Sequence, residues 1–367
     1  MKQAYLPDEI FTGTNTVSGK VLLTENNRIT GLQPAGDLPS GYELRAFPGC
    51  LIAPAFIDLQ IYGGNGKLFS HSLDTESLEA TRAYCAAGGC SHFMITMATN
   101  STENVLRGIE TVRNWFDSGK KGLLGLHLEG PWISPAKKGA HIEAFIKKPT
   151  LSELNDLLEK GKGVVRMITL APEQCDDEII RLLLDNSILV SAGHSNANYS
   201  RAKDVFNLGV PAATHLFNAM SPLQGREPGM VGAIYDDHRV MSSIICDGVH
   251  VDFASVRISK KIMGERLFFI TDAVTEIREG NYKHIFQGDR YTLPDGTLSG
   301  SCMTMISTFK NAVAKSGIQM EEALKMCSLY PARLLKDPSL GRIESGQPAD
   351  FIILKKDNLD LVSSQFQ

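Results

Sequence analysis

The 367-residue sequence has neither a long hydrophobic stretch nor a strong excess of one charge. No uninterrupted apolar run reaches the roughly 18 residues that span a bilayer, and the N-terminal MKQAYLPDEIFTG lacks the apolar segment of a signal peptide. A net charge of -4 and an isoelectric point near 6.2 provide no broad basic surface. We therefore expect a cytoplasmic protein that binds neither membrane nor nucleic acid.

The cysteines and glycines lack the spacing of a metal or nucleotide motif. There are seven cysteines, an odd number, and none forms a CxxC pair, so free and mostly buried thiols in a reducing compartment are expected. The GGNG at residues 63–66 has neither the GxGxxG nor the GxxxxGK[ST] spacing. It predicts a tight turn rather than a phosphate site.

What the sequence does contain is a series of short apolar runs separated by helix-like segments. Between Pro54 and Lys336 we count eight such runs, which favours a (β/α)8 TIM-like barrel over an open sheet. Thr75 is the expected cap of the first helix. The expected helices are near 74–88, 102–118, from 152, 176–186, 199–208, 305–316 and 320–336.

Both chain ends have β-type patterns. VSGKVLLTENNRITGLQP alternates and is broken at Asn26-Asn27, a hairpin signal, and GRIESGQPADFIILKKD ends in a strand. Because isolated hairpins are marginally stable, we expect one small β-sandwich domain from residues 1–53 and 341–367. Residues 54–340 would form the catalytic barrel, so the fold class is α/β.

Five of the apolar runs between Leu123 and Val274 end in residues suited to metal or acid–base chemistry. In a barrel these strand ends meet at one mouth. An unpaired charge buried there would cost several kcal/mol, so these side chains are poor core residues. The residues at these ends are Glu129, His194, His215, Asp247, His250 and Asp272.

Glu129, His194 and His215 offer one carboxylate and two imidazoles. Three protein ligands leave a position open for water, as a catalytic metal site requires. The alternative is that the three are separately satisfied polar residues at the barrel mouth. Three potential ligands at related strand ends favour a site for one divalent metal ion.

The other candidates each have a structural alternative. Asp272 suits a general base beside a metal site, or else a helix N-cap, although no helix signal follows TDAV. His141 lies in a long loop and suits a carbonyl-polarising role or an ordinary surface position. Arg226 and His250 suit an anion, with a solvated loop position as the alternative for Arg226. Asp247 is better explained as a turn residue or as a support for residues that contact the ligand.

The segments HLEGP, GHS, THLFNAM, CDGVH and FITDAV occur in this order. With them the sequence resembles the N-acetylglucosamine-6-phosphate deacetylases of the amidohydrolase superfamily over nearly its whole length, including GSCMTMI and YPARLL near the end. THLFNAM together with HLEGP is specific to this group. Other amidohydrolases share only the general layout of barrel and ligands.

The resemblance implies a role for each candidate. Glu129, His194 and His215 would hold the metal, Asp272 would act as base and then acid, and His141 would help to polarise the acetamide carbonyl. In relatives one arginine reaches across from the neighbouring subunit, so a homodimer or higher homo-oligomer is expected. The implied substrate contacts are Ala140, His141, Asn218, Ala219, Arg226, His250, Leu298, Ser299 and Gly300.

One departure concerns the number of metal ions. Amidohydrolases often carry HxH at the end of the first strand, and here Gln60 and Tyr62 take these positions. Neutral glutamine is a weak ligand and tyrosine at its ordinary pKa a weaker one. We expect one ion per subunit, with zinc the first choice and Fe²⁺ or another divalent ion the alternative.

The expected activity is hydrolysis of N-acetyl-D-glucosamine 6-phosphate to D-glucosamine 6-phosphate and acetate, a step of amino-sugar catabolism and recycling. The alternatives are a deacetylase for another amino-sugar phosphate, such as the galactosamine epimer, and a non-catalytic barrel that binds sugar phosphate. An amidohydrolase for cyclic amides or purines would not need the HLFNAM segment.

Overall fold

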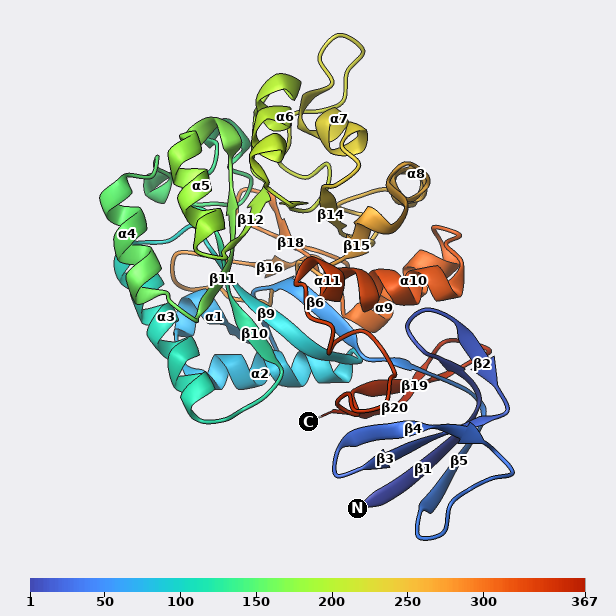
Figure 1. The fold of residues 1–367 in the computed structure, drawn as a ribbon. Helices are drawn as coiled ribbons and strands as arrows, with labels where there is room; N and C mark the ends of the chain where they lie inside the picture. Colours follow the sequence, from blue (N-terminus) through green and yellow to red (C-terminus); the bar gives the residue numbers. More distant parts are fainter. Residues whose placement is uncertain (367) are drawn as a thin grey trace.

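The computed structural model describes residues 1–366, and its larger part is a parallel barrel (Figure 1). Each strand pairs in parallel with the next one along the chain, in the order β6, β9, β10 to β15. The predicted (β/α)8 barrel is confirmed. Its strands are β6 (Phe56–Ile61), β9 (Cys90–Ala98), β10 (Leu123–Glu129), β11 (Val165–Leu170), β12 (Leu189–Ala192), β13 (Ala212–Ala213), β14 (Met241–Ile244) and β15 (Leu267–Phe269).

The barrel closes between the ends of β6 and β15. The backbone N–H of Asp272 donates to the carbonyl of Gln60 at 3.0 Å, and the N–H of Tyr62 donates to that of Ala273 at 2.9 Å. The buried Asp58 carboxylate accepts the backbone N–H of Thr271 at 3.2 Å. These bonds bring the tips of the first and last strands side by side.

Helices surround the barrel (Figure 1). The third, α3, is typical: Ser101 caps its first turn, and Ile109, Val112 and Trp115 turn inward at helical spacing. Burying each such side chain contributes about 1.5–3 kcal/mol. The helices are α1 (Phe69–Ser72), α2 (Thr75–Ala87), α3 (Thr102–Asp117), α4 (Leu151–Lys160), α5 (Asp177–Asp185), α6 (Tyr199–Leu208), α7 (Gly229–Asp236), α8 (Phe253–Met263), α9 (Met305–Ala314), α10 (Met320–Cys327) and α11 (Leu329–Leu334).

Two helix predictions need correction. Asp74, not Thr75, caps α2, since its Oδ1 accepts the N–H of Ser77 at 2.8 Å. The single closing helix expected over 320–336 is two helices. The chain breaks at Ser328, whose φ of -136° is not helical, and Pro331 has no N–H to donate to the carbonyl four residues earlier.

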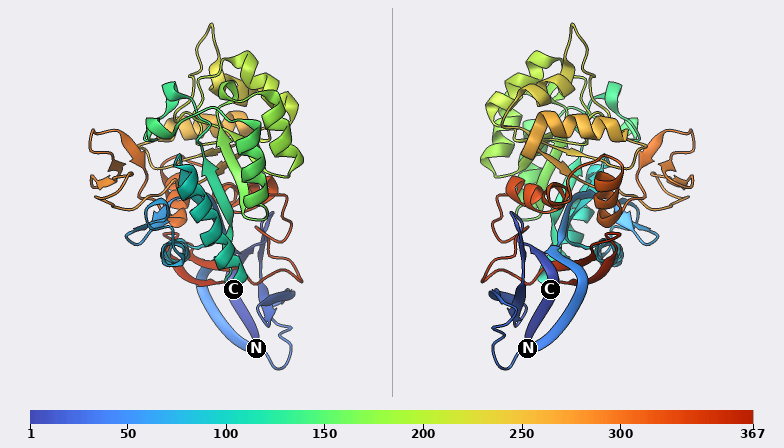
Figure 2. Two further views of the ribbon diagram at one scale, coloured as in Figure 1. Left: turned by 90° about the vertical axis from the view of Figure 1, so that its left-hand side faces the viewer. Right: turned by 90° about the vertical axis from the view of Figure 1, so that its right-hand side faces the viewer.

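Both chain ends contribute to one antiparallel and parallel sheet, which lies beside the barrel in both views of Figure 2. Asn26 and Asn27, with φ of 51° and 59°, form the predicted hairpin turn. The small β-domain built from both ends is confirmed; β20 has no counterpart among the predicted strands. The strands are β1 (Lys2–Phe11), β2 (Thr16–Ser18), β3 (Lys20–Glu25), β4 (Arg28–Pro34), β5 (Glu43–Pro54), β19 (Phe351–Lys355) and β20 (Leu361–Gln365).

The proposed boundaries after residues 53 and 340 stay predictions, and Gln367 lies outside the described residues. Among residues 1–366 no helix has the length and apolar character needed to cross a membrane. The cytoplasmic location also stays a prediction.

Two small antiparallel sheets stand near the barrel mouth. Strands β7 (Gly63–Gly64) and β8 (Lys67–Leu68) flank Asn65 and Gly66, whose positive φ values confirm the tight turn predicted for GGNG. The second sheet consists of β16 (Ile285–Phe286), β17 (Tyr291–Thr292) and β18 (Leu298–Gly300). It follows the tip of β15 and stands out at one side of the barrel (Figure 2).

Candidate active site

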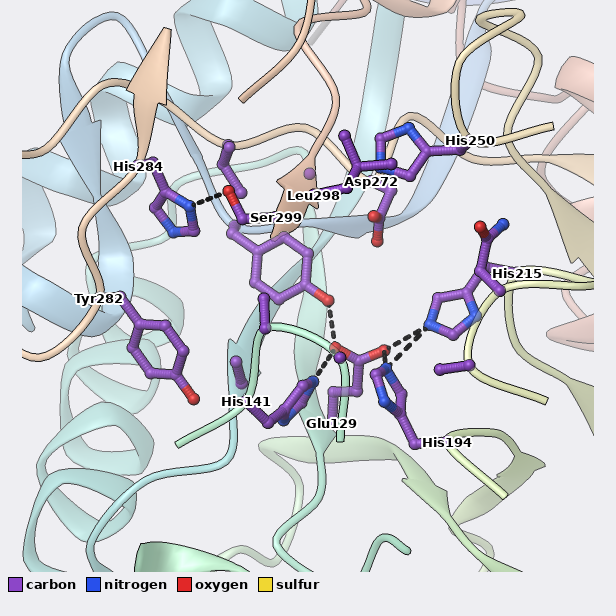
Figure 3. Close-up of a pocket in the computed structure, with 18 of the residues that line it drawn as sticks. Glu129, His141, His194, His215, His250, Asp272, Tyr282, His284, Leu298 and Ser299 are labelled. Atoms are coloured by element: carbon purple, nitrogen blue, oxygen red, sulfur yellow. Dashed lines mark hydrogen bonds and ion pairs between the residues drawn. The ribbon is translucent and has the colours of Figure 1, made fainter. Parts of the chain in front are cut away.

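A cavity opens among the C-terminal ends of the barrel strands (Figure 3). All but one of the predicted site residues line it; Arg226 does not. Residues from many segments thus meet at one point, although their individual roles stay predictions. The predicted residues in the wall are Glu129, Ala140, His141, His194, His215, Asn218, Ala219, His250, Asp272, Leu298, Ser299 and Gly300.

Three of the strand-tip residues have unusual backbone conformations. His194, His215 and Asp272 have φ values of 47°, 36° and 55°, in the left-handed region that non-glycine residues rarely occupy. Such conformations cost about 1–3 kcal/mol each and cluster at functional sites. Here they aim three side chains into the cavity immediately after their strands end.

Glu129, His194 and His215 have the spacing of a metal-ligand set. Glu129 Oε1 lies 3.0 Å from His215 Nε2 and 3.3 Å from His194 Nε2, and the two nitrogens are 3.1 Å apart. Ligand atoms about 2.0–2.1 Å from a tetrahedral zinc ion lie about 3.3 Å from one another. These residues therefore fit a divalent ion.

The second ring nitrogens support this ligand set. His194 Nδ1 lies 2.8 Å from the carbonyl of Lys137, which can only accept, so Nδ1 carries the proton and the Nε2 lone pair faces the site. The buried His215 Nδ1 has no partner among residues 1–366. A chain that already fixes the tautomer of His194 suits metal coordination, in which the distal N–H of a ligand is held in this way.

His141 belongs to an alternative grouping, because its ligand atoms, with those of Glu129 and His194, also lie within 4.8 Å of one another. Its Nδ1 accepts the backbone N–H of Thr99 at 3.2 Å, which places the ring proton on Nε2. Nε2 then donates to Glu129 Oε2 at 3.1 Å. A protonated nitrogen cannot bind a cation, so His141 suits a hydrogen-bond donor better than a ligand.

Gln60 and Tyr62 touch both carboxylates of the site. Gln60 Nε2 lies 3.0 Å from Glu129 Oε1 and 2.8 Å from Asp272 Oδ1, and so bridges two like charges. The Tyr62 hydroxyl donates to Glu129 Oε2. Burial and the nearby Glu129 charge raise the pKa of Tyr62 well above its ordinary value, so the phenol stays neutral.

Asp272 faces this group from the end of the last strand. Burial raises its pKa, the charge on His215 opposes that, and the charge on Glu129 adds to it, with a net rise. The next helix along the chain, α9, begins only at Met305. The N-cap alternative for Asp272 is therefore wrong.

The carboxylate at the tip of β10 and the two imidazoles after β12 and β13 thus form one cluster at the barrel mouth. The amidohydrolase family model matches residues 51–367. This chain belongs to the amidohydrolase family.

Relatives of this amidohydrolase include two sugar-phosphate deacetylases. It is 35% identical to the N-acetylglucosamine-6-phosphate deacetylase of Haemophilus influenzae, over 96% of this chain and 95% of that protein. It is 33% identical to the N-acetylgalactosamine-6-phosphate deacetylase of Shewanella sp. strain ANA-3, over 85% and 81%. The crystal structure of the N-acetylglucosamine-6-phosphate deacetylase from Pasteurella multocida superposes with a TM-score of 0.95, at 31% identity, covering 100% and 98% of the chains.

On the His250 side of the cavity, this amidohydrolase has hydrogen-bonding groups but no cationic side chain. His250 Nδ1 lies 2.6 Å from Asp247 Oδ2, and Asp247 also accepts the backbone N–H groups of Val249 and His250. Asp247 is thus a turn residue that orients His250, as predicted. Neither lysine nor arginine lines the cavity. Arg226 is exposed, in the segment between α6 and α7 that projects from the barrel (Figure 1).

Several residues in or beside the cavity of the amidohydrolase have little or no signal in the sequence. Tyr282 and His284 line the wall but lie in an irregular segment without apolar periodicity. Thr99, which fixes the ring of His141, follows strand β9 and could have been suspected as one more polar residue at a strand end. From the sequence, Tyr62 is notable only because it stands where a metal-ligating histidine is common.

Proposed function

We propose that the protein hydrolyses N-acetyl-D-glucosamine 6-phosphate to D-glucosamine 6-phosphate and acetate. The observation that carries this proposal is the meeting of Glu129, His194 and His215 within 3.3 Å of one another, with Asp272 joined to them through Gln60. The likeness to deacetylases along nearly the whole chain supports it.

Glu129, His194 and His215 would hold one divalent ion, and we propose zinc because a carboxylate and two imidazoles suit it. When bound, such an ion lowers the pKa of a water molecule toward neutrality and so supplies a nucleophile. Gln60 donates to Glu129 Oε1 and Tyr62 donates to Oε2, so hydrogen-bond donors stand where ligands of a second ion would be needed, which supports one ion rather than two.

The remaining chemistry belongs to Asp272 and His141. Asp272 takes a proton from the attacking water as the oxygen–carbon bond forms. The Nε2–H of His141 donates to the oxygen that becomes negative on the acetyl carbon. Asp272 then passes its proton to the departing nitrogen as the carbon–nitrogen bond breaks, which leaves a free amine and acetate.

The sugar phosphate would lie along the wall that contains Asn218, Ala219 and His250, with Ala140 and residues 298–300 completing the contacts. This part of the wall has no cation for a phosphate, although charge-assisted bonds are the stronger ones. We propose that Arg226 of a second copy of the chain supplies it, which makes a homodimer the working form. The projecting position of Arg226 supports this arrangement.

The test is acetate release from four compounds: N-acetylglucosamine, N-acetylgalactosamine and their 6-phosphates. We expect kcat/KM to be highest for N-acetylglucosamine 6-phosphate and to fall at least tenfold without the phosphate, since charged hydrogen bonds contribute about 1.5–3 kcal/mol. The Shewanella relative makes the galactosamine epimer the second candidate. A higher kcat/KM for that epimer would select it, and no acetate from any compound would contradict both.

The state of the cysteines bears on the cellular compartment in which the protein acts. All seven cysteines are free thiols, and six of them are buried. Such a set suits a reducing compartment, and we propose the cytoplasm.

A further inference from the structure

We propose that His284 binds a hydroxyl group of the sugar next to the acetamido carbon and thereby helps to select the substrate. The inference rests on the proposed function, since it concerns the same cavity. It adds a contact that neither the strand-end pattern nor the resemblance indicates.

His284 is held rigidly in the cavity wall. Its backbone N–H donates to the carbonyl of Ile277 at 2.8 Å, and the N–H of Ile277 donates back at 3.0 Å. Its ring stacks on Tyr282, with centroids 6.2 Å apart and planes 9° apart. The Tyr282 hydroxyl in turn donates to the carbonyl of Thr99 at 2.6 Å. The imidazole therefore has a fixed position, and little rotamer freedom is lost when it binds a ligand.

One ring nitrogen is used inside the protein and the other is left over. His284 Nδ1 lies 2.9 Å from the Ser299 hydroxyl. No partner of Nε2 is found in the described part of the chain, although the side chain is 4% exposed and lines the cavity. Nε2 is not among the fully buried side-chain atoms that lack a partner, so it is open to the cavity. A group of a bound ligand can therefore reach it.

The chemistry of the ring indicates what the ligand group is. Burial lowers the pKa of His284 to about 4, so the ring is neutral at pH 7. A neutral imidazole cannot neutralise a phosphate. Ser299 can donate to Nδ1 or accept from it, so Nε2 can serve as donor or acceptor, and a hydroxyl group matches either state.

The position of the ring narrows the choice of hydroxyl. Tyr282 and His284 lie across the cavity from His215 and His250 (Figure 3). With the acetamido group at Glu129 and the phosphate on the side of His250, the carbons that can face His284 are those flanking the acetamido carbon. These are C1 and C3 of the sugar.

The experiment couples a protein change to a substrate change. We would compare His284→Phe, which keeps an aromatic ring on Tyr282, with the wild type on N-acetylglucosamine 6-phosphate and on its 1-deoxy and 3-deoxy analogues. For the wild type, we expect loss of the contacted hydroxyl to lower kcat/KM about five- to tenfold, the value of one neutral hydrogen bond. In His284→Phe, loss of the same hydroxyl should have no further effect.

Two further variants keep the result decisive. His284→Gln retains a polar group near the position of Nε2 and should restore part of the discrimination. His284→Leu, which also removes Nε2, replaces His284→Phe if that variant does not fold. His238→Phe changes an exposed histidine outside the cavity and should behave like the wild type.

One deoxy analogue should lower kcat/KM in the wild type but not in His284→Phe. That analogue shows whether His284 contacts the hydroxyl at C1 or at C3. If His284→Phe lowers kcat/KM by the same factor for all three compounds, the assignment is overturned, because the change then has a structural effect only. Absence of acetate from the parent compound with wild-type protein would instead contradict the proposed function.

Discussion

Three imidazoles surround the Glu129 carboxylate, and the partner of each ring distinguishes them. His194 donates its Nδ1–H to a carbonyl, and His141 accepts a backbone N–H at Nδ1. His194 therefore turns an Nε2 lone pair toward the site, whereas His141 turns an Nε2–H toward it. His215 has no partner at Nδ1 within residues 1–366. The same residue type can thus bind a cation or donate to an oxyanion according to one hydrogen bond.

Asp272→Asn tests the proton transfer. The amide has the same shape but cannot accept the proton, so kcat should fall about 10²- to 10⁴-fold. Metal content and thermal unfolding should stay close to the wild type, as they should in the exposed control Asp295→Asn, which should also keep full activity. Turnover near the wild-type value in Asp272→Asn would exclude Asp272 as the base.

At the scale of elements, the segment around strands β16–β18 adds to the barrel what the strand tips lack. It supplies Tyr282, His284 and residues 298–300 to the cavity. The Tyr282 hydroxyl attaches it to Thr99, and the paired bonds between His284 and Ile277 hold the segment itself together. The burial of His284 also makes the stability of the fold sensitive to pH.

His284 should destabilise the fold in acid. Its folded-state pKa of about 4 is below the ordinary value of the unfolded chain. The unfolded state therefore binds more protons between about pH 6.5 and 4, and stability present above pH 6.5 is lost as the pH falls. Between pH 7 and 4.5 this loss amounts to about 2 kcal/mol.

Chemical denaturation of the wild type and His284→Phe at both pH values measures this term. The wild type should lose about 2 kcal/mol more than the variant on acidification. Equal losses in the two proteins would show that His284 is not buried as a neutral ring.

The strand tips could be predicted from sequence, and the irregular segments could not. Glu129, His194 and Asp272 each end an apolar run, and barrel geometry then places run ends together. His284 follows no run, and its position depends on contacts with Tyr282, Ser299 and Ile277 that no local pattern encodes. The apolar pattern continues through Pro331, so the sequence does not indicate the break between two helices at Ser328.

At the scale of the whole molecule, two features stand out. The two chain ends are joined in one sheet, and the cavity at the barrel mouth has no lysine or arginine in its wall. Strand β19 pairs with β5, which runs directly into the first barrel strand. The projecting segment with Arg226 lies outside its own cavity. In the symmetric dimer proposed above, this segment would lie at the cavity of the other copy.

Co-expression of two impaired variants, assayed at a substrate concentration well below the KM of Arg226→Ala, tests the dimer. Arg226→Ala should raise KM for the phosphorylated sugar about 10- to 100-fold, and Asp272→Asn should lower kcat. When the two chains are co-expressed, dimers with one of each contain one intact site, so about a quarter of wild-type activity should return. Monomers by sedimentation, or no recovery in the mixed sample, would contradict a shared site.

Acetate release from N-acetylglucosamine 6-phosphate, measured as zinc is added back to chelator-treated protein, tests the central claim most directly. The account predicts no release without metal and a rate that rises until one ion per chain is bound. Release that persists without metal, or no release at any metal content, would contradict it.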